Sequence, residues 1–155
     1  MAVEIERKFL ITSDGWLNDV GEGIHYRQGY LSSNEKSSVR IRIEGERANI
    51  NIKGATVGLT RSEFEYPLPL EDAQELLDTL CDPRQLEKRR YHLRVGEHQW
   101  EVDQFLGENL GLVVAEIELS SEEEPFQRPS WLGEEVSHDT RYYNSCLCRH
   151  PYSRW

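Results

Sequence analysis

The sequence predicts an α+β protein that is mainly β, a closed eight-stranded antiparallel β-barrel with a few covering helices. Two observations support this prediction. Charged and apolar residues alternate along one segment after another, and alternation of this kind has the period of an extended chain. The connections between these segments are mostly short and contain glycine, so consecutive strands are expected to pair antiparallel.

The first strand shows the alternation most clearly. Glu4, Glu6 and Lys8 fall on one face of an extended chain, while Ile5 and Phe9 fall on the other. The same pattern recurs downstream, with acidic and basic residues mixed on the polar face. We therefore predict eight strands, at residues 3–10, 25–32, 38–44, 48–54, 60–66, 87–95, 98–105 and 112–119.

Helices are predicted in one connection and near the C-terminal end. Residues 71–80 place three leucines and an alanine on one helical face, with acids in the first turn. Asp139 is a candidate N-cap for a terminal helix that runs to Leu147. Ser120 and Ser121, each three residues before a glutamate, predict the start of a further short helix.

The recurring charged face needs a location in the fold. If the strands close into a barrel, the apolar faces can turn outward against covering helices and the charged faces can line a polar lumen. The alternative for any single strand is a solvated outer face, whose surface ion pairs stabilise little. Because the pattern recurs in strand after strand with both signs of charge, we favour a charged tunnel.

Composition limits the possible functions. The chain has 155 residues, which fits one domain (1–155) with a poorly patterned tail from about residue 149. Its formal net charge of −10 argues against a general nucleic-acid binder. A charged fraction of 30% would fit disorder, but four tryptophans, seven tyrosines and clean periodicity indicate a folded chain.

No segment reads as a targeting signal or a membrane span. The N-terminal residues enter the first strand directly, and no apolar stretch approaches the length needed to cross a bilayer. The three cysteines, Cys81, Cys146 and Cys148, form no recognisable disulfide framework. We therefore expect a reduced, cytoplasmic protein with no membrane partner.

An ordered series of short motifs runs along the chain. It comprises EIERKFL from Glu4, QGYL from Gln28, RIR from Arg40, IKG from Ile52, TRSEFEYPLP from Thr60, EKRRY from Glu87, EVDQF from Glu101, AEIEL from Ala115 and WLGEEV from Trp131. In this order the motifs resemble the CYTH family, also called the triphosphate tunnel metalloenzymes, and in particular its short bacterial branch. The resemblance implies an eight-stranded antiparallel tunnel that binds a triphosphate with a divalent metal ion.

The resemblance also implies which side chains bind. The triphosphate is expected to contact seven cations: Lys8, Arg40, Arg42, Lys53, Arg61, Lys88 and Arg90. The metal ligands are expected to be Glu4, Glu6, Asp103, Glu116 and Glu118. The chemistry of these residue types independently supports the assignment, since guanidinium forks and ammonium groups suit phosphate oxygens. Hard oxygen ligands without His or Cys clusters favour Mg²⁺ or Mn²⁺.

Three of these positions are candidates for catalysis. Tyr30 and Lys88 could meet in the lumen, where the lysine would hold the phenol or tune a proton transfer; a packed core tyrosine is the alternative. Glu116 could act as a metal ligand or as a general base, and the sequence does not separate these roles.

Four further residues are weaker candidates. Glu63 and Glu65 fall on the predicted lumen face, but they could simply neutralise Arg61 or other cations. Arg27 and Arg141 could reach a tunnel mouth, or they could pair with acids on the surface.

The expected reaction is hydrolysis of the terminal phosphoanhydride of inorganic tripolyphosphate, which makes the protein a metal-dependent inorganic triphosphatase. A nucleoside or thiamine triphosphatase and a class IV-type adenylate cyclase are alternative enzymes, although cyclisation needs a base and ribose pocket that the sequence does not reveal. A non-catalytic polyphosphate-binding module is an alternative of another class, and the retained acids argue against it. The expected partner is a small-molecule triphosphate rather than nucleic acid, for a monomer or homodimer.

Overall fold

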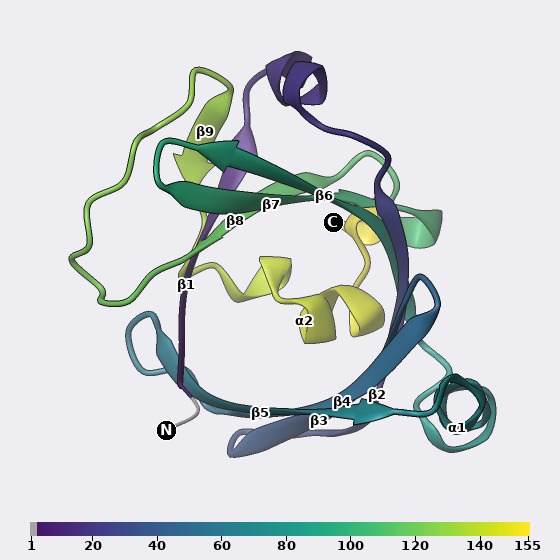
Figure 1. Cartoon of the computed structure of the whole chain (residues 1–155). Coiled ribbons are helices and arrows are strands. Elements are labelled where there is room, and N and C mark those ends of the chain that lie inside the picture. Colours follow the sequence, from purple (N-terminus) through teal and green to yellow (C-terminus); the bar gives the residue numbers. More distant parts are fainter. Residues whose placement is uncertain (1–2) are drawn as a thin grey trace.

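A closed antiparallel β-barrel dominates the computed structural model, which describes residues 3–155 (Figure 1). The ring runs in the order β5-β4-β3-β2-β6-β7-β8-β1 and closes where β1 pairs with β5. The strands are β1 (Val3–Ile11), β2 (Ile24–Ser33), β3 (Ser37–Glu44), β4 (Arg47–Gly54), β5 (Thr60–Leu68), β6 (Leu86–Val95), β7 (His98–Phe105), β8 (Val113–Glu118) and β9 (Leu132–Glu135). The eight predicted strands and the predicted fold class are therefore confirmed.

β1 closes the barrel by pairing along both of its edges. Glu6 to Leu10 pair with β8 on one edge, while Val3 to Ile5 pair with β5 on the other. The short strand β9 takes over this second edge further along, where Phe9 lies opposite Glu135. β9 was not predicted, because a four-residue strand is too short to establish an alternating pattern.

The apolar outer faces of the strands form the core together with the segments that cover them. On one side, Phe9, Trp100 and Ile117 pack under Trp131 and under Trp16 of the 3₁₀ helix η1 (Asp14–Asp19). On the opposite side, Ile41 and Ala48 pack under α1 (Leu70–Glu75) and the turn that follows it. The apolar faces thus point outward and the polar faces point into the barrel, as the alternation predicts.

The helix predicted at 71–80 is confirmed in position, but its second half is π-helical rather than α-helical. α1 continues into a single π-helical turn, η2 (Leu76–Leu80). Ala73 and Leu77 are buried against the barrel, whereas Leu80 is 67% exposed. The wider turn rotates Leu80 away from the face on which a regular 3.6-residue period places it.

The C-terminal helix differs from the prediction in both length and location. Asp139 accepts a hydrogen bond from the Arg141 backbone but caps only the 3₁₀ turn η4 (Thr140–Tyr142). Tyr143 then adopts an extended conformation, so α2 (Asn144–Arg149) is a separate helix. Figure 1 shows α2 within the ring of strands rather than on the outside.

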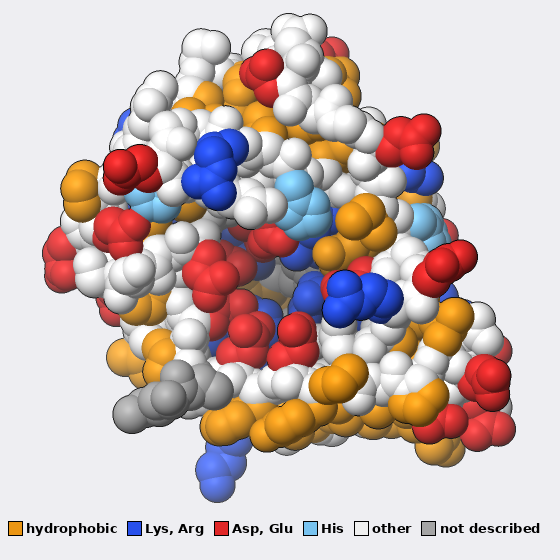
Figure 2. All heavy atoms as spheres, in the orientation of Figure 1, with side chains coloured by type: hydrophobic (Ala, Val, Ile, Leu, Met, Phe, Trp, Pro, Cys, Tyr) orange, Lys and Arg blue, Asp and Glu red, His pale blue; other side chains and the backbone are white. Residues whose placement is uncertain are grey.

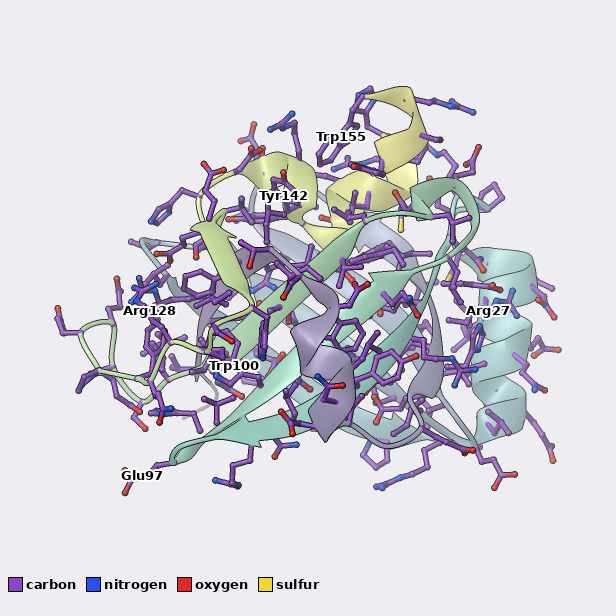
Figure 3. The ribbon with its side chains drawn as sticks, turned by 90° about the horizontal axis from the view of Figure 1, so that it is seen from above. Arg27, Glu97, Trp100, Arg128, Tyr142 and Trp155 are labelled. Carbon is purple, nitrogen blue, oxygen red and sulfur yellow. The ribbon has the colours of Figure 1, made fainter. Side chains whose placement is uncertain are left out.

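α2 closes one end of the lumen. Leu147 is completely buried on this helix, and it packs in one cluster with Leu86, Phe105 and Val114, which occupy inward positions on β6, β7 and β8. After α2 the chain forms a last 3₁₀ turn, η5 (Tyr152–Arg154), and Trp155 then packs edge-on against Tyr142 (Figure 3). The predicted tunnel therefore has α2 across one end and an open mouth at the other.

The short helix predicted at Ser120 and Ser121 is wrong. The Ser120 backbone N–H donates to the Glu124 carboxylate, and the connection between β8 and β9 contains turns instead. Phe126 of this connection packs edge-on against Phe9 and Trp100. Packing of this aromatic side chain on the barrel fixes the loop without a helix. A 3₁₀ turn, η3 (Gly107–Asn109), joins β7 to β8.

Candidate functional site

Polarity changes along the inward faces of β1 and β6. On β1 the inward residues run from Glu4 through Lys8 to Leu10, and on β6 they run from Arg90 to Leu86. The apolar ends surround α2, and the charged ends surround the open mouth. Figure 2 shows this mouth as a hollow ringed by acidic and basic side chains.

The hollow is a cavity of about 370 Å³ that every strand of the closed ring helps to line. Fourteen of the predicted site residues lie on its wall: Glu4, Glu6, Lys8, Tyr30, Arg40, Arg42, Lys53, Arg61, Glu63, Glu65, Lys88, Arg90, Glu116 and Glu118. The structure therefore brings together residues that are up to 114 positions apart in the sequence, Glu4 and Glu118.

The floor of the cavity contains a buried ionic network. Asp103 is fully buried, and its carboxylate oxygens accept from Lys88 Nζ at 2.6 Å and from Arg90 Nε at 2.7 Å. Burial raises the pKa of Asp103, but Arg90 and Lys88 outweigh it, and the net pKa lies below the usual value. Asp103 thus lies beneath the cavity surface, on the same inward face of β7 as Glu101, and holds two cations. Its predicted contact with metal stays a prediction.

Lys88 is the most deeply buried cation of the site. Its side chain is 1% exposed, and its Nζ contacts Asn144 Oδ1 at 2.9 Å in addition to Asp103. Burial and the nearby Arg90 guanidinium lower the pKa of Lys88. The Lys88 ammonium also lies 5.7 Å from the ring centroid of Tyr26.

Tyr30, the candidate partner of Lys88, lines the same cavity and has Arg40 as its charged neighbour. Burial raises its pKa, and the Arg40 guanidinium across the β2–β3 pair opposes that shift. The phenol is therefore protonated at neutral pH and can donate a hydrogen bond into the cavity that it lines.

Glu4 and Glu116 are carboxylates with cationic partners. Glu4 lies 2.9 Å from Arg61 Nε and 3.2 Å from Lys53 Nζ. Burial raises the pKa of Glu4, but these two cations outweigh it and the net pKa falls below the ordinary value. Glu116 behaves in the same way, because the cations around it, chiefly Lys8, outweigh its burial.

Glu6 and Glu118 have too little positive charge around them. The register of β1 and β8 places the two residues directly opposite each other. Burial and the charges of Glu116 and Glu4 raise the pKa of Glu6 to about 8, although Lys8 Nζ lies 3.9 Å away. Burial and Glu4 likewise raise the pKa of Glu118. The wall of the cavity formed by β1 and β8 therefore carries excess negative charge.

This acidic wall fits a divalent cation. The available donors are hard carboxylate oxygens, which Mg²⁺ and Mn²⁺ prefer, and a cation would relieve the repulsion that raises these pKa values. Across residues 3–155, no three acidic, His or Cys side chains are already gathered at ligand spacing. Substrate oxygens and water would then complete the coordination, which is usual for Mg²⁺ bound through one or two carboxylates.

The two weakest arginine candidates lie outside the cavity. Arg27 donates to Asp78 at 2.8 Å and to Gln85 at 3.1 Å on the outer side of the barrel, beside α1 (Figure 3). Arg141 binds Asp139 at 2.7 Å and lies over the Trp155 ring. Both residues therefore pair with acids on the surface, which is the alternative given for them above. Arg27 points outward from β2, and Arg141 lies in the exposed 3₁₀ turn η4 that precedes α2.

Sequence reasoning missed several residues of the lining. Tyr26 packs against the guanidinium groups of Arg42 and Arg90 at about 5 Å, and Glu101 accepts from Arg90 at 3.1 Å. Both could have been found, because Tyr26 is in phase with Tyr30 and Glu101 with Asp103. Other missed residues are Ser38, Glu44, His92, Tyr143, Asn144 and Ser145. No sequence pattern points to Tyr143, Asn144 and Ser145 as lining residues, because only the tertiary fold places them inside the barrel.

Comparison with known proteins identifies the family. The CYTH domain matches residues 2–143. The chain belongs to the CYTH family. An inorganic triphosphatase of Acetivibrio thermocellus is 43% identical over 155 residues, covering 100% of this chain and 99% of that protein. An inorganic triphosphatase of Nitrosomonas europaea is 36% identical over 150 residues, covering 93% of this chain and 95% of that protein.

A solved structure shares the architecture of this CYTH protein. The crystal structure of the inorganic triphosphatase NE1496 superposes with a TM-score of 0.65 at 31% identity, and the match covers 96% of this chain and 95% of that one. The PH1012 protein from Pyrococcus horikoshii matches with a TM-score of 0.59 at 19% identity, over 77% of this chain and 81% of that one. The latter likeness concerns the fold alone.

Proposed function

We propose that this CYTH protein is a divalent-metal-dependent inorganic triphosphatase that cleaves the terminal phosphoanhydride of tripolyphosphate. The observation that carries the proposal is the convergence of seven cations and an acidic wall on one cavity. One phosphoryl group needs only two or three cationic partners, so seven suit a linear chain of three. The names of the two closely similar bacterial relatives support the same activity.

In this proposal the cations bind the triphosphate and the acids bind the metal. Lys8, Arg40, Arg42, Lys53, Arg61, Lys88 and Arg90 contact phosphate oxygens, with the arginines acting as forks and the lysines as point charges. Glu4, Glu6, Glu116 and Glu118 face the metal, and Glu63 and Glu65 balance the charge of Lys53 and Arg42. We assign Asp103 to holding Lys88 and Arg90 in place rather than to the metal.

The reaction transfers the terminal phosphoryl group to water. A bound Mg²⁺ or Mn²⁺ would supply charge neutralisation and acidify a water molecule. Lys88 and Tyr30 donate hydrogen bonds to the phosphoryl oxygens as charge develops, since both line the cavity. Glu116 stays ionised between Lys8 and Arg90, which suits a cation ligand better than a proton acceptor. The bridging P–O bond breaks, and phosphate and pyrophosphate leave.

The lining gives less support to a nucleotide substrate. A base needs an apolar or aromatic surface on which to stack. Three tyrosines line the cavity, but Tyr26 packs against arginines, Tyr143 lies 5.2 Å from Lys8 Nζ and Tyr30 adjoins Arg40. These rings are therefore already occupied by cations. A binding module without catalysis would not need the repelling acids Glu6 and Glu118, which destabilise the fold.

We further infer that the protein works in the cytoplasm as a monomer or homodimer. Cys81, Cys146 and Cys148 are free thiols, which suits a reducing compartment. All the helices in residues 3–155 are too short or too polar to cross a membrane. The cavity wall comes from one chain, so the proposed site needs no second subunit.

The test is phosphate release from tripolyphosphate, ATP, thiamine triphosphate and pyrophosphate, each with Mg²⁺, with Mn²⁺ and with chelator. We expect metal-dependent release that is fastest from tripolyphosphate. Faster release from ATP or thiamine triphosphate would replace the proposed substrate, and cyclic AMP formed from ATP would identify a cyclase. Tight triphosphate binding without turnover would leave only the binding module.

A further inference from the structure

Asn144 makes a contact with the active cavity that the sequence did not predict. It is the first residue of α2 and lines the cavity. Its Oδ1 accepts from Lys88 Nζ at 2.9 Å and from Gln28 Nε2 at 3.0 Å. Gln28 is fully buried on β2, so the two donors approach the same oxygen from neighbouring strands of the barrel.

The chemistry of the donors fixes the orientation of both amides. An ammonium group can only donate, so the Asn144 atom that faces Lys88 must be its oxygen. The Gln28 atom that faces this oxygen must then be its amide nitrogen. This arrangement joins five buried or half-buried groups in one line: Gln28, Asn144, Lys88, Asp103 and Arg90.

Packing of α2 holds Asn144 at this position. Leu147, three residues further along the helix, is completely buried between β6, β7 and β8. The extended backbone of Tyr143 lets the chain turn into the barrel just before Asn144. The match to the CYTH domain covers residues 2–143, and Asn144 is the next residue.

We propose that Asn144 is a positioning residue that directs Lys88 at the innermost phosphoryl group; this inference rests on the proposed function. In its protonated form, Lys88 Nζ carries three protons. Asp103 takes one and Asn144 takes another, which leaves the third for a phosphate oxygen. Without the Asn144 acceptor, the ammonium is free to turn toward Asp103, beneath the cavity surface, and the phosphoryl group loses a donor.

The test is a double-mutant cycle between Asn144→Leu and Lys88→Met. Leucine has the same branched skeleton as asparagine but accepts no hydrogen bond. Calorimetry measures tripolyphosphate binding in chelator, where turnover does not intervene, and phosphate release with metal gives kcat and KM. Cys146→Ser, on the same helix but away from the cavity lining, controls for general disturbance of α2. Thermal melting checks folding, and Asn144→Ser replaces the leucine variant if that fails to fold.

We expect Asn144→Leu to weaken binding by about tenfold to a hundredfold, the effect of one lost hydrogen bond to a charged group. In the Lys88→Met background the same change should alter binding less than twofold, because Asn144 acts through Lys88. Equal losses in both backgrounds, or an equal loss in Cys146→Ser, would overturn the positioning role. If the wild-type chain neither binds nor cleaves tripolyphosphate, the proposed function fails and this role fails with it. Normal wild-type turnover with an unaffected Asn144→Leu variant overturns the role of Asn144 alone.

Discussion

Glu6→Gln should stabilise the barrel at alkaline pH although it removes a proposed metal ligand. Burial, Glu116 and Glu4 raise the pKa of Glu6 from 4.5 to about 8. An acid whose pKa rises on folding favours the folded state while it is protonated, and this advantage is lost as the pH rises through the folded pKa. The difference between these two pKa values corresponds to a free-energy change of about 5 kcal/mol. Because the Glu6 side chain is 17% exposed and solvent screens part of its interactions, we expect about 2 kcal/mol to appear as stability.

The assay is urea unfolding in chelator at pH 5, 7 and 9. The free energy of unfolding of Glu6→Gln should be close to the wild-type value at pH 5 and exceed it by about 2 kcal/mol at pH 9. Glu135→Gln is the matched control of opposite sign, because a hydrogen bond from Arg7 lowers the pKa of Glu135. That variant should lose about 1 kcal/mol at pH 7 and 9.

Two results would refute this reasoning about Glu6. One is a difference between Glu6→Gln and wild type that is the same at pH 5 and pH 9. The other is a variant that is less stable than wild type at pH 9. In the presence of Mg²⁺ or Mn²⁺, phosphate release by Glu6→Gln should fall in spite of the gain in stability, which separates the ligand role from a folding role.

Three further predictions follow from the placement of charge. Asp103→Asn leaves Lys88 and Arg90 without their shared carboxylate, so urea unfolding should show a loss of about 3 kcal/mol; unchanged stability would contradict the network. Phosphate release should stop in chelator and return with Mg²⁺ or Mn²⁺, and activity that persists in chelator would refute the metal role of the acidic wall. Arg27→Ala and Arg141→Ala should leave the KM for tripolyphosphate within about twofold, since both side chains bind surface acids; a tenfold rise would place them in the site.

Much of the cavity could be predicted from the sequence because the signal is local. Side chains alternate between the two faces of any strand, so the spacing of Glu4, Glu6 and Lys8 alone places them on one face. The same period on β3 places Arg40 and Arg42 together. Glu101 shares the predicted face of Asp103 but is given no role from the sequence, and Tyr26 obeys the same period without being singled out.

The C-terminal segment shows where local patterns stop being informative. Asp139 has the chemistry of an N-cap and does cap a turn, but the helix that contacts Lys88 begins five residues later. Nothing in the spacing of residues 139–149 indicates that this helix enters the barrel. Its position depends on the fit of Leu147 among inward-facing residues from three strands, which are distant in sequence.

The inward turn of the charged faces follows from the amino-acid sequence alone, because the two-residue period of a strand is a local property. The pairing of those charges follows only from the three-dimensional fold. When the barrel closes, Glu4 pairs with Lys53 and Arg61. Asp103 is buried beneath Lys88, and Glu6 lies opposite Glu118. Partners are set by the register between strands far apart in the chain, and a buried carboxylate is stable or strained according to the cation that this register supplies.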